Sequence, residues 1–338
     1  MKNRFFRKKD IFKRFSIRFF RVLGFLILGF MMACGDDSSS TAEKLSEVAV
    51  EPDLPIPDFS ADSAYAFIEK QLAFGSRVPN TGSHLACAQW LSDKLESYGA
   101  KVIRQAAVVK AFDGTRLNMQ NIIASYNPEK NRRILLTAHW DSRPFADQDS
   151  ERQNQPIPGA NDGGSGVGVL LEVARQLGQA NPQVGVDIIL WDAEDYGKTE
   201  VPGSYCLGSQ YWVVNKHKPN YDAMYGINLD MVGDPDARFT REGHSMEYAA
   251  NVVEKVWRTA RLYGYDQYFS LERTEPIIDD HVYVNRKGGI RMIDIIDKPA
   301  NQSFFDEWHT HRDDINTISK ETLKAVGQTV TAVVYREK

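Results

Sequence analysis

The sequence predicts an α/β protein in which a mixed, mostly parallel central sheet lies between two layers of helices, a three-layer αβα arrangement. Its 338 residues are 42% hydrophobic and 25% charged, a balance typical of a globular chain with a large core. From residue 60 onward, apolar strand-like runs alternate with helical patterns of about ten or more residues, as in parallel strands joined by helical crossovers. We therefore expect residues 60–338 to form a single α/β domain.

The pattern predicts the individual elements in order. The second helix has Ser83 as its expected N-cap and stops at Gly99, and the continuous apolar run before Trp191 is typical of a strand buried on both faces. The expected helices cover residues 64–74, 83–98, 167–177, 209–215, 245–262 and a C-terminal segment from Ser319. The expected strands cover residues 101–109, 121–126, 133–138, 184–190, 225–229 and 290–296.

Residues 1–33 are typical of a lipoprotein signal peptide. Nine Lys and Arg residues against one acid occupy residues 1–21, and the apolar run of twelve residues that follows is shorter than the ~20 needed to span a bilayer. The run ends in small residues before Cys34, which resembles the lipobox of bacterial lipoproteins, in which the cysteine is lipidated. The alternative is a single-pass anchor with an incidental cysteine.

Residues 34–59 are rich in Asp, Ser and Pro and are predicted to be a flexible tether. A lipid anchor at Cys34 followed by a tether predicts an extracytoplasmic, membrane-anchored protein that faces the periplasm or the cell surface of a bacterium. Because the basic residues are concentrated at the N-terminus, the remaining chain is more acidic than the overall net charge of -4, which disfavours nucleic acid as a partner. Cys87 and Cys206 remain, and whether they pair stays open.

Candidate ligands follow several predicted strands. Ligands in open α/β sheets bind beyond the carboxyl ends of the strands, so acidic and imidazole side chains at these positions are expected to converge. His139 and Asp141 share one side of their strand, which lets the carboxylate orient the imidazole. The further candidates are Asp162, Asp192, Glu194, Asp195, Asp230 and His309. Nitrogen and anionic oxygen ligands of this kind suit zinc.

Two other catalytic motifs fail. The glycines at 163–168 resemble a nucleotide-binding loop, but Val169 breaks the G-x-G-x-x-G pattern and no Gly-Lys-Ser/Thr follows. A G-x-S-x-G nucleophile motif around Ser165 fails because Val167 stands where the second glycine is required. Phosphate binding and serine hydrolysis are therefore disfavoured.

The motifs together resemble a known family. The ordered set is His139-x-Asp141, Gly159-Ala-Asn-Asp162-Gly, Asp192-Ala-Glu194-Asp195, Asp230, Asp280-His281 and His309-Thr310. It is similar to the zinc-aminopeptidase-like fold of the M28 peptidases and, within them, to glutaminyl-peptide cyclotransferases of the bacterial lipoprotein kind. Trp308-His309-Thr310 followed by Asp313-Asp314 favours the cyclotransferases. The resemblance spans residues 60–338.

The resemblance implies a role for each matching residue. Asp162, Asp195 and His309 would hold one zinc ion per chain. Glu194 would be the general acid and base, with Asp230 and Asp279 as hydrogen-bonding carboxylates and Trp308 as an apolar wall of the substrate pocket. His139, with Asp141 behind it, matches a ligand of the second metal in two-zinc aminopeptidases.

Two departures from the family pattern leave alternatives open. Asp195 stands where Glu is commoner, so Glu194 and Asp195 could exchange the roles of base and ligand. Asp294 falls near a His of animal cyclotransferases, and its role stays open.

The implied activity is zinc-dependent cyclisation of the N-terminal glutamine of peptides and proteins to pyroglutamate, with release of ammonia. One alternative is a two-zinc aminopeptidase, in which His139 and Asp230 complete a second metal site. A third hypothesis is a lipid-anchored peptide-binding protein without turnover.

Overall fold

The computed structural model describes residues 55–300 and 302–338, which belong to one compact unit. The predicted signal peptide, the lipidation site at Cys34 and most of the predicted tether lie outside the described residues. The end of the tether prediction is wrong, because Phe59 is 1% exposed and belongs to the main hydrophobic core. Its ring packs against Gly327, where any Cβ would lie only 2.2 Å from Phe59 Cζ. The folded domain therefore begins before residue 60.

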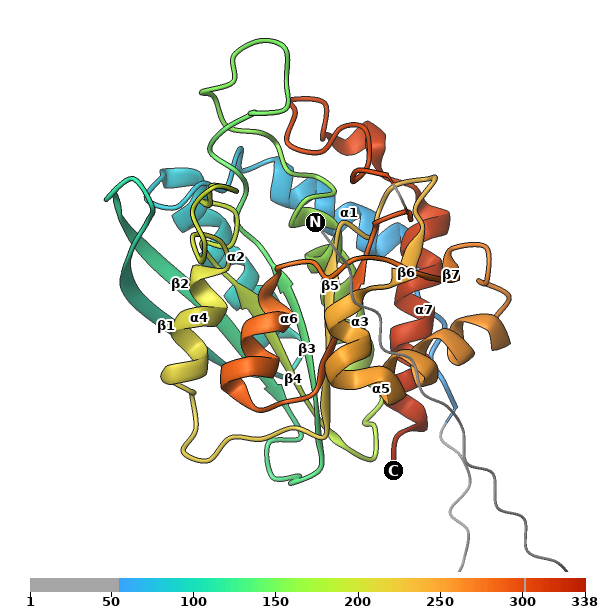
Figure 1. The fold of residues 1–338 in the computed structure, drawn as a ribbon. Helices are drawn as coiled ribbons and strands as arrows, with labels where there is room; N and C mark the ends of the chain where they lie inside the picture. The colour runs from blue at the N-terminus through green and yellow to red at the C-terminus, as the bar shows by residue number, and fades with distance from the viewer. Residues whose placement is uncertain (1–54, 301) are drawn as a thin grey trace, which may run out of the picture. The chain divides into compact units, whose positions relative to one another are not determined.

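A six-stranded sheet forms the centre of the domain (Figure 1). Its strands are β1 (Lys101–Lys110), β2 (Arg116–Tyr126), β3 (Arg133–His139), β4 (Gly185–Trp191), β5 (Tyr225–Asp230) and β8 (Met292–Ile296). The order across the sheet is β1-β2-β4-β3-β5-β8. Strands β4, β3, β5 and β8 are mutually parallel, whereas β2 runs antiparallel to β1 and β4. The predicted mixed, mostly parallel sheet is confirmed.

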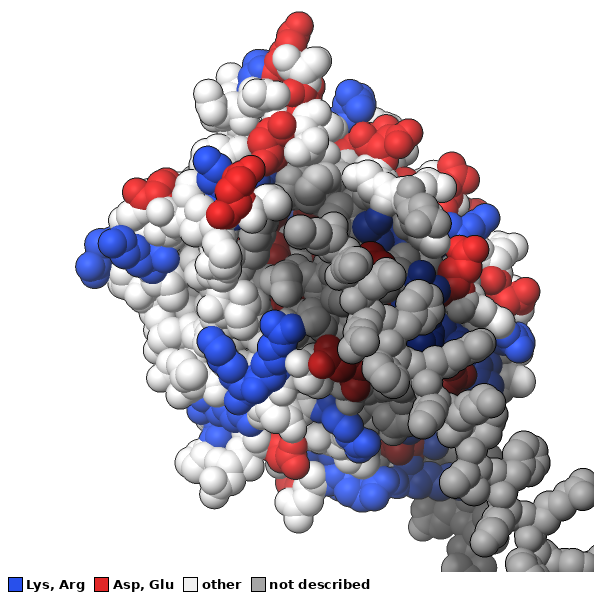
Figure 2. Space-filling view, viewed as in Figure 1, with Lys and Arg blue, Asp and Glu red and all other residues white. Residues whose placement is uncertain are grey.

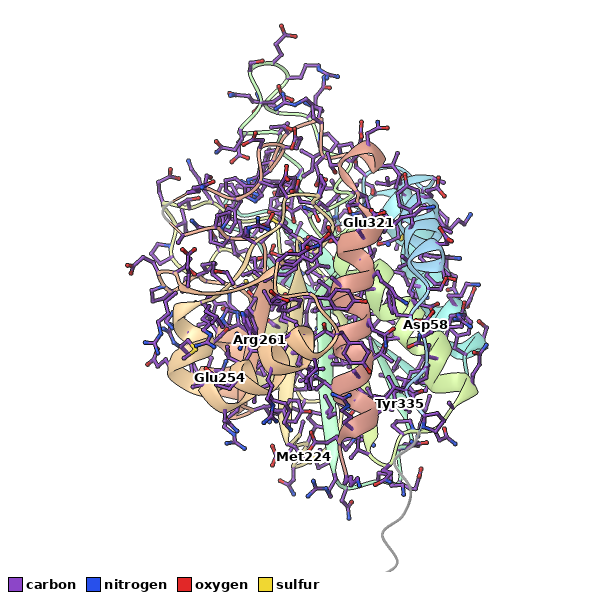
Figure 3. The ribbon with its side chains drawn as sticks, turned by 90° about the vertical axis from the view of Figure 1, so that its right-hand side faces the viewer. Asp58, Met224, Glu254, Arg261, Glu321 and Tyr335 are labelled. Carbon is purple, nitrogen blue, oxygen red and sulfur yellow. The ribbon has the colours of Figure 1, made fainter. Side chains whose placement is uncertain are left out.

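Helices cover both faces of the sheet, which confirms the three layers. One face carries α1 (Ala61–Leu72), α2 (Gly82–Ser97), α3 (Gly164–Gln179), α5 (Gly243–Leu262) and α7 (Lys320–Arg336). The other carries α4 (Leu207–Val214), α6 (Asp280–Tyr283) and the π-helical turn Val284–Gly288, and Figure 1 shows α4 and α6 in front of the sheet. In Figure 3, α7 runs from Glu321 to Tyr335 beside α5, which carries the labelled Glu254 and Arg261.

The central strands form because most of their side chains are apolar on both faces of the sheet, and the buried Asp187 is hydrogen-bonded to Arg133. Every residue of β3 and β4 is buried, as expected for parallel strands covered on both faces. Thr81 rather than Ser83 caps α2, because its side chain accepts the hydrogen bond from the backbone N–H of His84. The N-cap therefore lies two residues earlier than predicted.

Several smaller elements were not predicted from the pattern. Strand β2 starts at Arg116 because it pairs with β1 along its whole length, from Lys110 opposite Arg116. The two-stranded sheet of β6 (Phe239–Arg241) and β7 (Phe269–Arg273) and the short 3₁₀ turn Ile315–Thr317 were missed. Phe269 and Leu271 alternate with polar residues in β7, but the strand has only five residues and most of its side chains are exposed, so the prediction missed it.

The surface carries charges of both signs, and the two cysteines among the described residues are buried. Figure 2 shows acidic and basic side chains interspersed over the described part of one face, a mixture that produces little long-range field of one sign. Within residues 55–300 and 302–338, none of the helices has both the length and the apolar character to cross a bilayer. Cys87 and Cys206 are both buried, and their thiols are free rather than paired in a disulfide.

Candidate functional site

The predicted strand-end residues gather at one edge of the sheet. His139 is the last residue of β3, Asp230 is the last residue of β5, and Glu194 and Asp195 follow the end of β4. Two long loops join them: the backbone N–H of Gln148 donates to the carbonyl of His309, and that of Ala160 donates to the carbonyl of Asp313. These loops lie together at the upper end of the molecule in Figure 1. The sequence-based expectation that the side chains converge is confirmed.

Asp162, Asp195 and His309 form a buried group suited to a metal ion. His309 Nε2 lies 3.4 Å from Asp195 Oδ1 and 3.5 Å from Asp162 Oδ2. Bonds of about 2.0–2.2 Å in a tetrahedron separate the ligand atoms of zinc by about 3.3 Å, which matches this spacing. The second oxygen of Asp195 is buried without a hydrogen-bond partner among the described residues. Spacing, ligand chemistry and the unpartnered oxygen all fit zinc.

Arg143 and Asp147 hold two of these side chains in place, and neither was predicted as a site residue. Arg143 Nη1 donates to Asp195 Oδ1 at 3.0 Å, and Arg143 also binds Asp147 through two nitrogens. Asp147 Oδ1 lies 3.2 Å from His309 Nδ1, so the other ring nitrogen, Nε2, faces the cluster. Burial opposes ionisation, yet His309 and Arg143 hold the pKa of Asp147 well below its usual range.

A second group consists of His139, Asp162 and Asp230, so Asp162 belongs to both groups. His139 Nε2 lies 3.0 Å from Asp162 Oδ1 and 3.2 Å from Asp230 Oδ1, which are hydrogen-bond distances. Gly163 makes room for this imidazole, because a Cβ there would lie 2.9 Å from His139 Cε1, and its φ of +84° favours glycine. The imidazole nitrogen of the second group thus lies closer to its carboxylate oxygens than the imidazole nitrogen of the first group does.

Asp141 lies behind both groups. Its Oδ1 is 3.5 Å from His139 Nδ1, on the side predicted from the strand period. Its two oxygens also accept hydrogen bonds from the backbone N–H groups of Glu194 and Asp195, at 3.1 and 3.2 Å. Asp141 therefore fixes the turn that carries the predicted base in addition to facing the imidazole.

Glu194 reaches the same cavity from a strained turn. Ala193 before it has a left-handed φ of +53°, a conformation that persists where the surroundings enforce it. Cys206 Sγ donates to Glu194 Oε1 at 3.1 Å, a contact that no sequence pattern predicts. Burial raises the pKa of Glu194 well above its ordinary value; His139 opposes this shift, and Asp195 reinforces it. A carboxyl whose pKa is raised in this way is suited to act as a general acid and base.

Asp230 and Asp279 place two more carboxyls around Glu194. Burial raises the pKa of Asp230 to about 7 against the opposing effect of His139. Asn228 Nδ2 donates to Asp279 Oδ2 at 3.0 Å and to Asp294 Oδ1 at 3.2 Å, so Asp294 belongs to the hydrogen-bonded surroundings of Asp279. Burial and the neighbouring Asp279 raise the pKa of Asp294 well above its ordinary value.

A cavity of about 330 Å³ opens onto these carboxyls. Apolar side chains line much of it, including Ile277, Ile278 and Phe304. Trp308 also lines the cavity, and its ring stacks on His309 with ring centroids 3.6 Å apart. Trp140 and Trp191 are instead fully buried in the core. The cavity combines an apolar wall with an acidic floor, which suits an N-terminal residue that has a short aliphatic side chain and a free α-amine.

The structure brings together the residues that the sequence placed in the site, with the exception of Asp192, whose carboxylate pairs with His84 Nε2 at 2.8 Å and does not line the cavity. Asp162, Asp195, His309, Glu194 and Asp230 all line the cavity, as do Asp279 and Trp308, with His139 and Asp141 behind them. The residues that hold them were missed. Among these residues, Arg143 and Asp147 could have been noticed in the sequence, because they are oppositely charged and four residues apart.

The fold and the site define a class of protein: a zinc-dependent αβα enzyme with an acidic base beside its metal ligands. Residues 121–334 match the model of peptidase family M28, and the chain belongs to this family. It is similar to a glutaminyl cyclase from Bacteroides thetaiotaomicron crystallised with N-acetylhistamine, at 50% identity and a TM-score of 0.82, over 84% of this chain and 100% of that one. A Zn-dependent exopeptidase from Parabacteroides distasonis is similar to the same extent, with 50% identity, a TM-score of 0.82 and coverage of 84% and 100%.

One similar protein is named as an aminopeptidase and not as a cyclase. Aminopeptidase YwaD of Bacillus subtilis is 30% identical over 264 residues, which are 76% of this chain. The chain spans about half the length of that relative, 53%. Because cyclase and exopeptidase names both occur among similar proteins, the chemistry of the site has to distinguish the two activities.

Proposed function

We propose that this protein cyclises the N-terminal glutamine of peptides and proteins to pyroglutamate, with release of ammonia, and that it uses one zinc ion per chain. The observation that carries the proposal is the difference between the two ligand groups. Asp162, Asp195 and His309 are spaced for zinc, whereas His139 contacts Asp162 and Asp230 directly at 3.0 and 3.2 Å. The similar glutaminyl cyclases support the same activity.

The reaction is intramolecular. The α-amine of an N-terminal glutamine attacks the γ-carbonyl carbon of its own side chain, the new N–C bond closes a five-membered lactam, and the bond to the side-chain nitrogen breaks. Orientation supplies much of the rate in such a reaction. When bound by Asp162, Asp195 and His309, zinc supplies a Lewis acid that polarises the carbonyl oxygen.

The chain's own carboxyls move the proton and hold the substrate. Glu194 takes a proton from the attacking amine and delivers it to the departing ammonia, a task that its raised pKa suits. Asp230 and Asp279 border the same cavity and accept hydrogen bonds from the substrate amine. Trp308 packs against the two methylene groups of the glutamine. The direct test is which of matched Gln- and Leu-peptides the protein turns over, with ammonia as the readout.

The two-zinc aminopeptidase is the second candidate, since His139, Asp162 and Asp230 supply ligands for a second ion. Glu194 would then activate a water molecule for peptide hydrolysis. A peptide-binding protein without turnover gives no reason for a carboxyl with a raised pKa beside the ligands.

The metal content separates these candidates. We expect the purified protein to hold one tightly bound zinc ion per chain, because the second group is closed by direct contacts. Elemental analysis after dialysis measures this ratio. Two zinc ions per chain, with the second lost in a His139→Ala variant, would contradict the one-zinc proposal and favour the aminopeptidase.

The proposal includes an extracytoplasmic location on a membrane, through lipidation of Cys34. Cys34→Ser protein is expected to appear in the soluble fraction, because the lipid is the anchor and the apolar run before Cys34 is removed with the signal peptide. Fractionation of cells that express either form measures the distribution. Cys34→Ser protein that stays wholly with membranes after signal processing would contradict the lipoprotein interpretation, and Cys87→Ser is the matched control.

A further inference from the structure

Glu242 is a buried carboxylate that the proposed reaction does not use. It precedes α5 and is 0% exposed. Its Oε1 accepts hydrogen bonds from the backbone N–H groups of His244 at 2.7 Å and Ile277 at 2.8 Å. Its Oε2 accepts from the backbone N–H of Ser245 at 2.7 Å, from Ser245 Oγ at 2.8 Å and from His281 Nε2 at 3.1 Å. A helix cap needs only the bonds to His244 and Ser245.

The two remaining bonds reach both ends of a short segment of the pocket. Residues 277–281 include Ile277, Ile278 and Asp279, which all line the proposed substrate cavity. Ile277 begins this segment and His281 ends it. A single carboxylate therefore holds the segment at both ends, one end on each of its oxygens.

The same carboxylate is connected to the far side of Asp279. His281 Nδ1 lies 3.4 Å from Asp294 Oδ2, and the backbone N–H of Asp294 donates to Ser245 Oγ at 2.9 Å. Asn228 then joins Asp294 to Asp279 through its side-chain amide. Asp279 is thus fixed through its own segment and through its hydrogen-bonded neighbours, and both routes end at Glu242.

Glu242 is ionised in this position. Burial opposes the charge, but the hydrogen bonds from His281, Ile277 and His244 lower its pKa to about 2. Both oxygens therefore act as acceptors. An amide in place of the carboxylate would direct an NH₂ group at N–H donors and break one half of the arrangement.

We propose that Glu242 is a positioning residue for the proposed cyclisation: it holds residues 277–281 so that Asp279 faces the amine of the substrate. The inference rests on the proposed function for its substrate, but the arrangement itself is a property of the fold. A helix cap alone would affect stability and leave the catalytic constants unchanged.

The test is a double-mutant cycle between Glu242 and Asp279, with kcat and KM for a Gln-peptide and the zinc content measured for each variant. Glu242→Gln is expected to lower kcat/KM about tenfold while one zinc ion is retained. In an Asp279→Asn background the same change is expected to cost less than about twofold, because Glu242 acts through Asp279. Equal losses in both backgrounds, or no loss in either, would overturn the proposal.

Two further variants separate positioning from stability. Ser60→Ala removes the side-chain cap of α1, away from the cavity, and is expected to lower the melting temperature without changing kcat or KM. His281→Asn keeps the bonds from His244 and Ser245 that cap α5 and removes the bond from His281 Nε2. It is expected to lower kcat/KM as Glu242→Gln does, and it carries the test if Glu242→Gln does not fold.

Hydrogen exchange gives a readout that does not depend on the reaction. Amides of residues 277–281 are expected to exchange at least about tenfold faster in Glu242→Gln than in the wild type, and at the wild-type rate in Ser60→Ala. Unchanged exchange in this segment would overturn the positioning role. Absence of ammonia release by the wild type would instead overturn the proposed function, so the two failures are distinguishable.

Discussion

Glu194→Gln is expected to keep its zinc ion and to lose about 10²–10⁴-fold in kcat for Gln-peptides, the range for removal of a general acid and base. The substitution is nearly isosteric and leaves Asp162, Asp195 and His309 untouched. It removes the group that takes the proton from the amine and delivers it to ammonia. The measurement combines ammonia release under saturating substrate with elemental analysis of the same preparation.

The matched control for this variant is Glu200→Gln, which makes the same chemical change at an exposed position of the same loop. It is expected to behave as the wild type. An active Glu194→Gln protein would contradict the assignment. Loss of zinc together with activity would show that Glu194 is the ligand and point to Asp195 as the base, the exchange that the shorter side chain at position 195 leaves open.

His309→Ala is expected to lose zinc and activity together. The imidazole supplies the single nitrogen of the Asp162, Asp195 and His309 group, and its removal leaves two carboxylates to hold the ion. Substitution of residues that merely orient zinc ligands costs about 10–100-fold in metal affinity, so loss of a ligand is expected to cost more. Titration with a competing chelator measures the affinity, and ammonia release measures the activity.

His311→Ala is the control, because His311 lies two residues away and pairs with Asp149 instead of the cluster, at 2.8 Å. It is expected to retain zinc. A His309→Ala protein that binds zinc as tightly as the wild type would contradict the ligand assignment and shift attention to the group around His139.

The sequence predicts the centre of this fold well because the central strands are mostly apolar, with few polar residues such as Asp187 inside them. Residues of β3 and β4 face helices on both sides, so their hydrophobic runs stand out from the polar loops. The ends of these runs also located the site, since ligands collect beyond the carboxyl ends of parallel strands. The short strands β6 and β7 give a much weaker signal, because β6 has only three residues and most side chains of β7 are half-buried or exposed.

The residues that hold the site in place could not be predicted in the same way. Glu242 and His281 are 39 positions apart and meet only in the folded chain, where the N-cap residue of α5 reaches the second residue of α6. Cys206 adopts a left-handed φ of +59°, and its thiol faces Glu194. No sequence pattern predicts this backbone conformation. Phe59 looked like part of a tether because its neighbours are prolines and acids, yet the space above Gly327 accommodates its ring.

The most direct test of the proposed function compares peptides that differ only in the first residue. Peptides that begin with Gln are expected to release one equivalent of ammonia and to lose their reactive amine, whereas the same peptides beginning with Leu or Ala remain intact. The reason is geometric, because a glutaminyl side chain places a carbonyl within reach of its own amine. Release of free leucine from the Leu-peptide, with no ammonia from the Gln-peptide, would contradict the cyclase proposal and establish the two-zinc aminopeptidase in its place.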